Sequence, residues 1–97
     1  MNVIYQLEGI EFEWNSQKAA ANVQKHSVRF EEAAEAFLDP FYQVGDASRQ
    51  GEDRSFILGY SLLPRLLLAV YVERGQRIRI ISARVATRSE RYLYEQS

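Results

Sequence analysis

The chain has 97 residues, a length that suits one folded domain, and its charged residues nearly cancel to a formal net charge of −1. It has no cysteine, which excludes a disulfide framework and a thiolate metal site and fits a reducing cytosol. The N-terminus lacks the basic start and long apolar run of a signal peptide, and the apolar run at 66–72 is too short to span a bilayer. We therefore expect one cytoplasmic domain, without a membrane segment.

Charge is distributed unevenly along the chain. Residues 1–53 hold ten acidic and four basic side chains, a net charge of −6, whereas residues 54–97 hold eight arginines and three glutamates, a net charge of +5. This asymmetry suggests a basic surface that faces an anion, most commonly a nucleic acid. The alternative is that the two halves neutralise each other across the fold.

The first half predicts a strand and two helices. Residues 10–14, IEFEW, alternate as a half-buried strand does, and Asn15 or Ser16 can cap a helix over residues 16–26. Four polar residues of that helix recur at i, i+4, i+7 and i+8 and form either a solvated face or a site: Lys18, Asn22, Lys25 and His26. A short amphipathic helix starts at Phe30 and is ended by Asp39-Pro40.

The second half has the period of a sheet. After a brief strand at 41–44 and a polar loop at 45–53, apolar residues alternate from Arg54, and 66–72 is typical of a buried central strand. A tight turn at 73–76 leads into a strand at 77–84, and this strand completes an antiparallel β-meander. The capping-box pattern at 87–90 predicts a C-terminal helix. The predicted fold class is α+β: an N-terminal strand and two helices, the meander, and one helix.

The last strand, RIRIISAR, carries three arginines. Simple alternation puts Arg77 and Arg79 on one sheet face, with Ile81 and Ala83, and Arg84 on the other face. Arg84 joins the first two only if a bulge or the end of the strand redirects its side chain. The alternative to a binding role is that Arg77 and Arg79 coat a solvated face and pair with glutamates.

Several kinds of catalytic site are excluded by the residues present. His26 is the lone histidine, so a ribonuclease mechanism that uses two histidines is excluded. One histidine and scattered carboxylates also do not show the spacing of metal ligands. Glycine-rich nucleotide loops and a nucleophile elbow are also missing. What remains is a cationic set that can bind phosphate and stabilise developing charge, so we expect neither a cofactor nor a metal.

Three stretches together carry a family resemblance: FEWNSQKAAANVQKHSVRFEEAAEAFLDP, EDRSFILG and YVERGQRIRIISARVATRSER. In order and content, they resemble the BrnT family of type II toxins, which are RelE-like in fold, over residues 12–94. Two residues depart from the family pattern, which usually has Asp where Asn15 stands and Gly where Ser27 stands. We expect a single toxin domain over 1–97, with residues 1–11 as an N-terminal extension.

The resemblance implies a ribonuclease toxin that blocks translation and is neutralised by a BrnA-like antitoxin. Such an enzyme needs no metal if the RNA supplies its own 2′-hydroxyl as nucleophile. The antitoxin would have a ribbon-helix-helix part, so this chain would meet operator DNA only through its partner. An alternative is a catalytically inactive RelE-like module that supports the antitoxin in transcriptional autoregulation. Direct DNA binding by this chain has less support, because no predicted helix carries a dense row of Lys and Arg.

The resemblance also selects residues, those that stand at positions matching the family pattern: Trp14, Lys18, Asn22, Lys25, His26, Arg54, Arg79, Arg84 and Glu90. We expect the catalytic residues to be Lys25, His26, Arg54, Arg79 and Arg84, with Lys25 or His26 transferring protons and the arginines clamping phosphate. RNA-binding residues are expected at Trp14, Lys18, Arg77 and Arg88. The alternatives are a core position for Trp14, a helix-pinning role for Asn22 and a capping role for Glu90.

Overall fold

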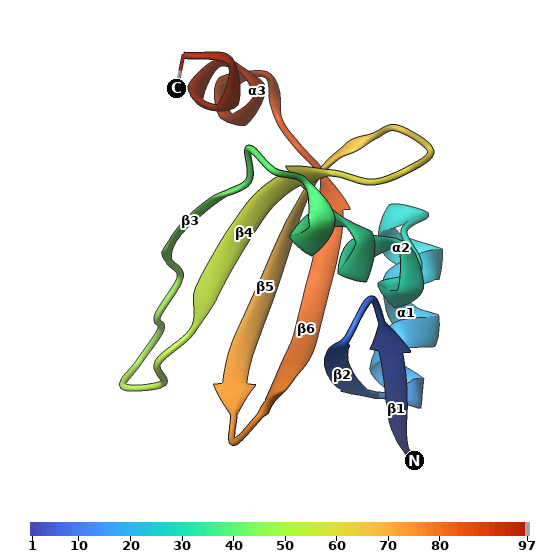
Figure 1. Cartoon of the computed structure of the whole chain (residues 1–97). Helices are drawn as coiled ribbons and strands as arrows, with labels where there is room; N and C mark the ends of the chain where they lie inside the picture. The colour runs from blue at the N-terminus through green and yellow to red at the C-terminus, as the bar shows by residue number, and fades with distance from the viewer. Residues whose placement is uncertain (97) are drawn as a thin grey trace.

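The computed structural model describes residues 1–96, and Figure 1 shows how the chain runs. It opens with a β-hairpin of β1 (Asn2–Leu7) and β2 (Ile10–Asn15), joined by Glu8 and Gly9, which both have positive φ. Positive φ at both central residues is what a tight two-residue hairpin turn needs. The predicted strand at 10–14 is confirmed. Residues 1–11 therefore supply an edge strand of the sheet, and their standing as an extension of the toxin domain stays a prediction.

The two predicted helices follow β2. α1 (Ser16–His26) begins after Asn15, whose Oδ1 accepts hydrogen bonds from the backbone N–H groups of Gln17 and Lys18 at 2.9 and 3.0 Å. It ends at Ser27, which has the left-handed φ of 58° that usually falls to glycine. α2 (Phe30–Glu35) continues into the short 3₁₀ helix η1 (Ala36–Leu38), and the chain then turns at Asp39-Pro40.

The rest of the sheet comes from β3 (Gln43–Asp46), β4 (Ser55–Tyr60), β5 (Leu66–Arg74) and β6 (Arg77–Val85). These four strands pair antiparallel in sequence order, which confirms the meander. The sheet order is β1-β2-β6-β5-β4-β3, and β2 joins β6 in parallel, with Glu13 opposite Arg79. α3 (Arg88–Glu95) starts with the predicted capping box of Thr87 and Glu90.

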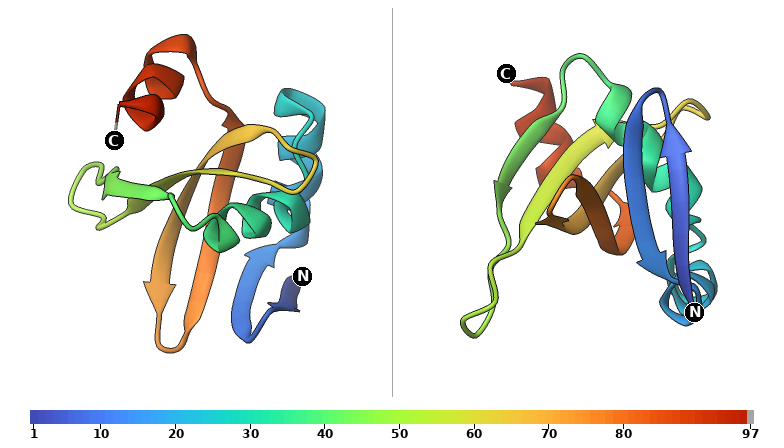
Figure 2. Two further views of the ribbon diagram at one scale, coloured as in Figure 1. Left: turned by 45° about the horizontal axis from the view of Figure 1, so that its top comes forward. Right: turned by 60° about the horizontal axis from the view of Figure 1, so that its bottom comes forward.

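The hydrophobic core lies between one face of the sheet and α1 and α2. Phe12, Ile57, Leu67 and Ile80 from four strands are buried there together with Phe30 of α2. Figures 1 and 2 show α1 and α2 gathered near β6 and the N-terminal hairpin, with α3 apart, beyond the end of β6. Within residues 1–96, no pair of helices covers the opposite face of the sheet, called the open face below, and α3 lies at one side of it (Figure 1).

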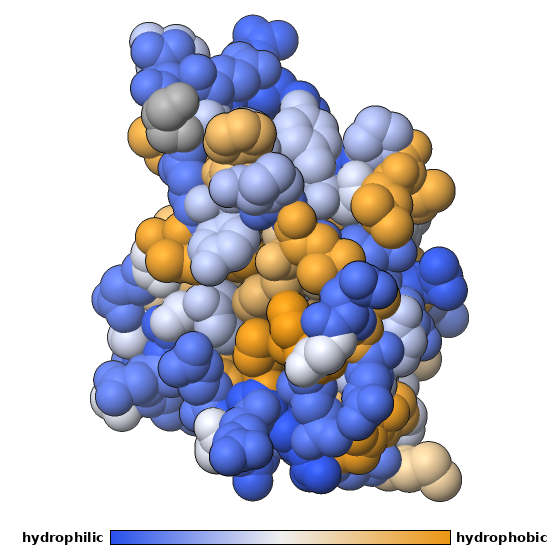
Figure 3. Space-filling model, viewed as in Figure 1, coloured by the Kyte–Doolittle hydropathy of each residue, from blue (hydrophilic) through white to orange (hydrophobic). Residues whose placement is uncertain are grey.

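Some apolar side chains stay outside the core. Leu62 and Leu63, in the loop between β4 and β5, are 74% and 66% exposed, and Figure 3 shows apolar surface where this loop projects. None of the helices within residues 1–96 is both long enough and apolar enough to cross a membrane.

Candidate functional site

A β-bulge decides which way Arg84 points. The β5–β6 register places Tyr71 opposite Ile80 but Val70 opposite Ser82, so Ile81 is an extra residue in β6. Ile80 and Ala83 both face the core, being 2% and 1% exposed. The alternation predicted through Ala83 is therefore wrong beyond Ile81, and Arg84 shares the open face with Arg77 and Arg79.

The middle of the open face is an apolar groove of about 420 Å³. Strands β4 and β5 supply its floor, β3 and α3 contribute side chains at its sides, and Arg84 and Glu90 stand among the lining residues. The remaining lining residues are Gln43, Val44, Ala47, Phe56, Leu58, Leu68, Val70 and Leu93. Arg84, with its partner Glu90, thus stands at the edge of an apolar floor, an arrangement that suits either an extended nucleic acid or a protein segment.

One cationic end of the face is formed by Arg54 and Arg79. Arg79 of β6 has Glu13 of β2 opposite it on one side and Val72 of β5 on the other. Ser55 pairs with Tyr71, so the preceding residue, Arg54, stands opposite Val72. Arg54, Val72, Arg79 and Glu13 therefore follow one another in a row across neighbouring strands. Two strand spacings, about 10 Å, separate the backbones of Arg54 and Arg79. The structure thus brings these two predicted catalytic arginines to the same end of the open face.

The arginines at this end are paired with carboxylates. Arg79 Nη1 lies 3.0 Å from Glu13 Oε2, and Arg77 Nε lies 2.6 Å from Glu11 Oε1. Burial raises the pKa of Glu13, but hydrogen bonds from Arg79 and Arg77 outweigh it and hold that pKa below its usual value. The pairing of Arg77 and Arg79 with glutamates is confirmed, and a binding role for the same arginines stays a prediction. Part of the charge asymmetry between the two halves is neutralised here.

Arg54 is held differently. Its Nη2 donates to Glu52 Oε1 at 2.8 Å, whereas its buried Nε has no hydrogen-bond partner among the described residues. An unpartnered buried donor is costly. Because this Nε is buried, it is closed to an anion on the surface, and the interaction of Arg54 with an anion would have to use its terminal nitrogens.

The other end of the open face is built around Arg84. Its guanidinium binds both carboxylate oxygens of Glu90, at 2.7 and 2.9 Å, which ties the end of β6 to the first turn of α3. Glu90 also accepts a hydrogen bond from the backbone N–H of Thr87, which confirms its capping role. Arg84 pairs with Leu68 of β5, and Arg79 pairs with Val72, which is four residues further along the same strand. The two ends of the face are therefore about 13 Å apart.

Asn22 sets α1 beside this end of β6. Its side-chain amide donates to Ala83 O at 2.8 Å and to Val28 O at 2.9 Å, and its Oδ1 accepts from Ala83 N at 3.1 Å. The predicted helix-pinning role of Asn22 is confirmed. Lys25 and His26 lie in the next turn of α1, so they are within one helical turn of the strand end that carries Arg84. Lys25 is exposed and His26 is partly exposed.

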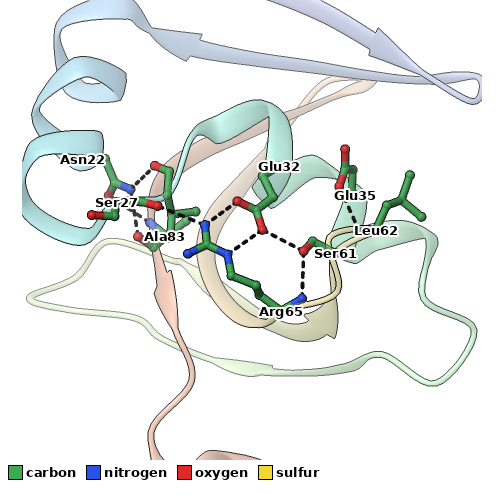
Figure 4. A network of polar contacts seen from close by, with 9 residues as sticks. Asn22, Ser27, Glu32, Glu35, Ser61, Leu62, Arg65 and Ala83 are labelled. Carbon is green, nitrogen blue, oxygen red and sulfur yellow. Dashed lines mark hydrogen bonds and ion pairs between the residues drawn. The ribbon is translucent and has the colours of Figure 1, made fainter.

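A second polar network, which the sequence did not reveal, fixes the turn after His26 (Figure 4). Arg65 donates through Nη2 to Ser27 O at 3.0 Å and through Nε to Glu32 Oε2 at 2.9 Å. Glu32 is 3% exposed and also accepts a hydrogen bond from Ser61 Oγ at 2.7 Å. The loop between β4 and β5 is thereby tied to α2 and to the end of α1.

The remaining predicted site residues are scattered. Trp14 is 2% exposed and packs edge-on against Phe30, with ring centroids 5.7 Å apart, so its core role is confirmed and the RNA-binding role expected for it is wrong. Lys18 is exposed but sits two turns before Lys25, and Arg88 is exposed in the first turn of α3. Because Asn22 is buried between Lys18 and Lys25, the polar stripe of α1 is not a single solvated face.

The comparisons with known proteins identify the family. A family model described as the ribonuclease toxin BrnT of type II toxin-antitoxin systems matches residues 14–90. The chain belongs to the BrnT family. The crystal structure of the Brucella abortus ribonuclease toxin BrnT resembles this chain with a TM-score of 0.61 and 23% identity, over 77% of this chain and 94% of that one. That likeness confirms the α+β fold, while the relation to RelE still rests on the sequence resemblance. No curated protein matches.

The family is one of ribonuclease toxins, so its members act on RNA and are countered by an antitoxin. Within residues 1–96, no group of three His, Asp or Glu side chains is arranged to hold a metal ion.

Proposed function

We propose that this BrnT-family chain is an endoribonuclease that cleaves RNA without a metal ion, with the RNA lying along the open face. The observation that carries the proposal is the pairing of Asn22 with Ala83, which sets Lys25 and His26 beside the strand end that presents Arg84. This pairing supports the proposal because it joins the helix that carries the candidate proton-transfer groups to the strand that carries a candidate phosphate ligand.

The chemistry follows from these groups. Attack of the RNA 2′-hydroxyl on the adjacent phosphorus needs a base for the hydroxyl proton, an acid for the leaving 5′-oxygen, and positive charge for the phosphoryl oxygens. Lys25 and His26 are the proposed acid and base, since both can exchange protons and both lie at the end of α1. Arg84 is the proposed phosphate ligand at that end, and Arg54 and Arg79 hold the RNA backbone at the other end.

The proposed partner is a BrnA-like antitoxin with a ribbon-helix-helix part, through which this chain reaches operator DNA. An antitoxin segment that pairs apolar and acidic side chains fits the open face, because the groove floor is apolar, Arg84 lines it, and Arg54 and Arg79 lie at the other end of the face. We expect carboxylates of the antitoxin near Arg79 or Arg84. Such a segment would cover the surface that RNA needs.

A second candidate function is an inactive module that only assembles with the antitoxin. The observation in its favour is that Arg77, Arg79 and Arg84 already have carboxylate partners within the chain. Induction of the chain without its antitoxin gene separates the two candidates. Growth arrest that the antitoxin gene reverses supports the ribonuclease, and undisturbed growth supports the module.

Cleavage of a labelled RNA by purified variants tests the site itself. Arg84→Ala and Lys25→Ala are expected to slow cleavage at least about tenfold, in line with the loss of a charged ligand or a proton-transfer group. Arg49→Ala is the matched control, since Arg49 is exposed in the loop before β4 and is in no ion pair within residues 1–96. Equal rates for Arg84→Ala and Arg49→Ala would remove Arg84 from the site.

A further inference from the structure

Three arginines of the β5–β6 hairpin converge on one buried carboxylate. Arg79, Arg77 and Arg74 each bring an Nη1 atom to Glu13, at 3.0, 3.4 and 3.7 Å. Glu13 is only 5% exposed, although it lies on the open face. Its neighbour on the same strand face, Glu11, contacts Arg77 alone among these arginines. Glu13 is thus the common partner of the cluster.

The cluster is not saturated by these contacts. A guanidinium has five N–H donors. Arg79 uses Nη1, toward Glu13 and toward Asn2 Oδ1 at 2.8 Å, and Arg77 uses Nε and Nη1. Within residues 1–96, Nη2 of Arg77 and both Nε and Nη2 of Arg79 make no hydrogen bond. Donors that are held in place but unused are what a phosphodiester oxygen requires.

The charge of the cluster also favours an anion. Three arginines against Glu11 and Glu13 leave one positive charge in excess. The phosphodiester of RNA carries one negative charge, so the cluster and the phosphodiester match.

We propose that Glu13 is a positioning residue for RNA binding: it orders the guanidiniums of Arg79, Arg77 and Arg74 so that their free donors meet an RNA phosphate. This inference rests on the proposed function, because it assumes that RNA lies on the open face. Arginine side chains lose rotamer freedom when they bind, so ordering them in advance strengthens binding. A carboxylate that only balanced charge would have the opposite effect, since its negative charge repels RNA.

Two charge-matched variants separate positioning from charge balance. Glu13→Gln and Glu11→Gln each remove one negative charge from the same face of β2, so both raise the general attraction for RNA equally. Glu13→Gln is expected to bind a labelled RNA oligonucleotide roughly fivefold more weakly than Glu11→Gln, the loss expected when one or two side chains must be ordered on binding. In cleavage assays, we expect Glu13→Gln to have a higher KM than Glu11→Gln, with little difference in kcat.

Ordering of the arginines is measured separately. In nuclear magnetic resonance spectra, restricted rotation of the Arg79 guanidinium, whose Nη1 is bonded to Glu13 and Asn2, is expected to give separate Nη1 and Nη2 signals in wild-type protein and in Glu11→Gln. In Glu13→Gln, these two Arg79 signals are expected to merge. Glu13→Asp keeps the negative charge but shortens the side chain by one methylene, and it is also expected to weaken RNA binding. This variant replaces Glu13→Gln in the comparison if Glu13→Gln does not fold.

The outcomes distinguish this inference from the proposed function. If both variants are folded and Glu13→Gln binds RNA as tightly as Glu11→Gln does, the positioning role is overturned and the ribonuclease proposal stays intact. Wild-type protein that binds the oligonucleotide but does not cut it overturns the ribonuclease proposal, and the comparison of binding still decides on Glu13. Absence of RNA binding by folded wild-type protein overturns both.

Discussion

The carboxylate of Glu90 accepts hydrogen bonds from both terminal nitrogens of Arg84 and also from the backbone N–H of Thr87, at 2.7, 2.9 and 2.9 Å. One side chain therefore caps α3 and holds the arginine at the end of β6. The hydrogen bonds from Arg84 outweigh burial and lower the pKa of Glu90 to about 2. This shared contact makes the first turn of α3 part of the open face.

Glu90 should make stability depend on pH in the acid range. Its folded-state pKa is depressed, so its contribution is present above the usual value of 4.5 and is lost as the pH falls toward about 2. We expect Glu90→Gln to be less stable than wild-type protein by about 1 kcal/mol at pH 7 and to lose less stability on acidification. Urea unfolding at several pH values measures this. Glu95→Gln is the control, and identical pH profiles for all three proteins would contradict the prediction.

Ser27 occupies a backbone position that favours glycine. Its φ of 58° is left-handed, and a residue with a Cβ is strained there. We expect Ser27→Gly to raise the free energy of unfolding by about 0.5 to 1 kcal/mol. Ser27→Ala, which keeps a Cβ, should give no such gain. A lower stability of Ser27→Gly in urea unfolding would show that the turn is not strained.

The pair of Arg65 with Glu32 should be important for stability. Removal of Arg65 leaves a carboxylate that is 3% exposed without its cation. We expect Arg65→Ala to lower the free energy of unfolding by about 2 to 3 kcal/mol, against less than about 0.5 kcal/mol for the exposed control Arg49→Ala. Glu32→Gln should lower the free energy of unfolding less in the Arg65→Ala variant than in wild-type protein. Additive costs would mean that the two side chains do not act as a pair.

Arg79 and Arg84 are expected to serve both RNA and the antitoxin. Arg79→Ala and Arg84→Ala should each reduce toxicity in cells and weaken antitoxin binding, most visibly at low salt. The sequence suggests a small stability cost, but both arginines have carboxylate partners, so a loss of about 1 kcal/mol should accompany the change. If folded Arg79→Ala keeps full toxicity and full antitoxin affinity, its guanidinium has only a structural role.

Local signals made much of the fold predictable from the sequence. The Asn15 cap and the capping box of Thr87 and Glu90 each involve residues at most three apart, and they mark the starts of α1 and α3. Alternation of apolar residues likewise predicted the meander. These features need no knowledge of what packs against them.

The parts that could not be predicted depend on distant partners. The bulge at Ile81 exists only in the pairing of β6 with β5, yet it decides the face on which Arg84 lies. Asn22 and Ala83 are 61 residues apart, and Arg65 and Glu32 are 33 apart. The sequence likewise does not show that Glu13, on β2, would meet the arginines of β6, because that requires the parallel pairing of two strands from opposite ends of the chain.

The central claim, metal-independent RNA cleavage on the open face, is tested most directly by sequencing the RNA ends that the purified chain produces in the presence of EDTA. Attack by the RNA 2′-hydroxyl predicts new ends with a 2′,3′-cyclic phosphate and a 5′-hydroxyl, formed by wild-type protein and Arg49→Ala but far more slowly by Arg84→Ala. RNA that stays intact with EDTA, in the presence of folded wild-type protein that still binds its antitoxin, would contradict the claim.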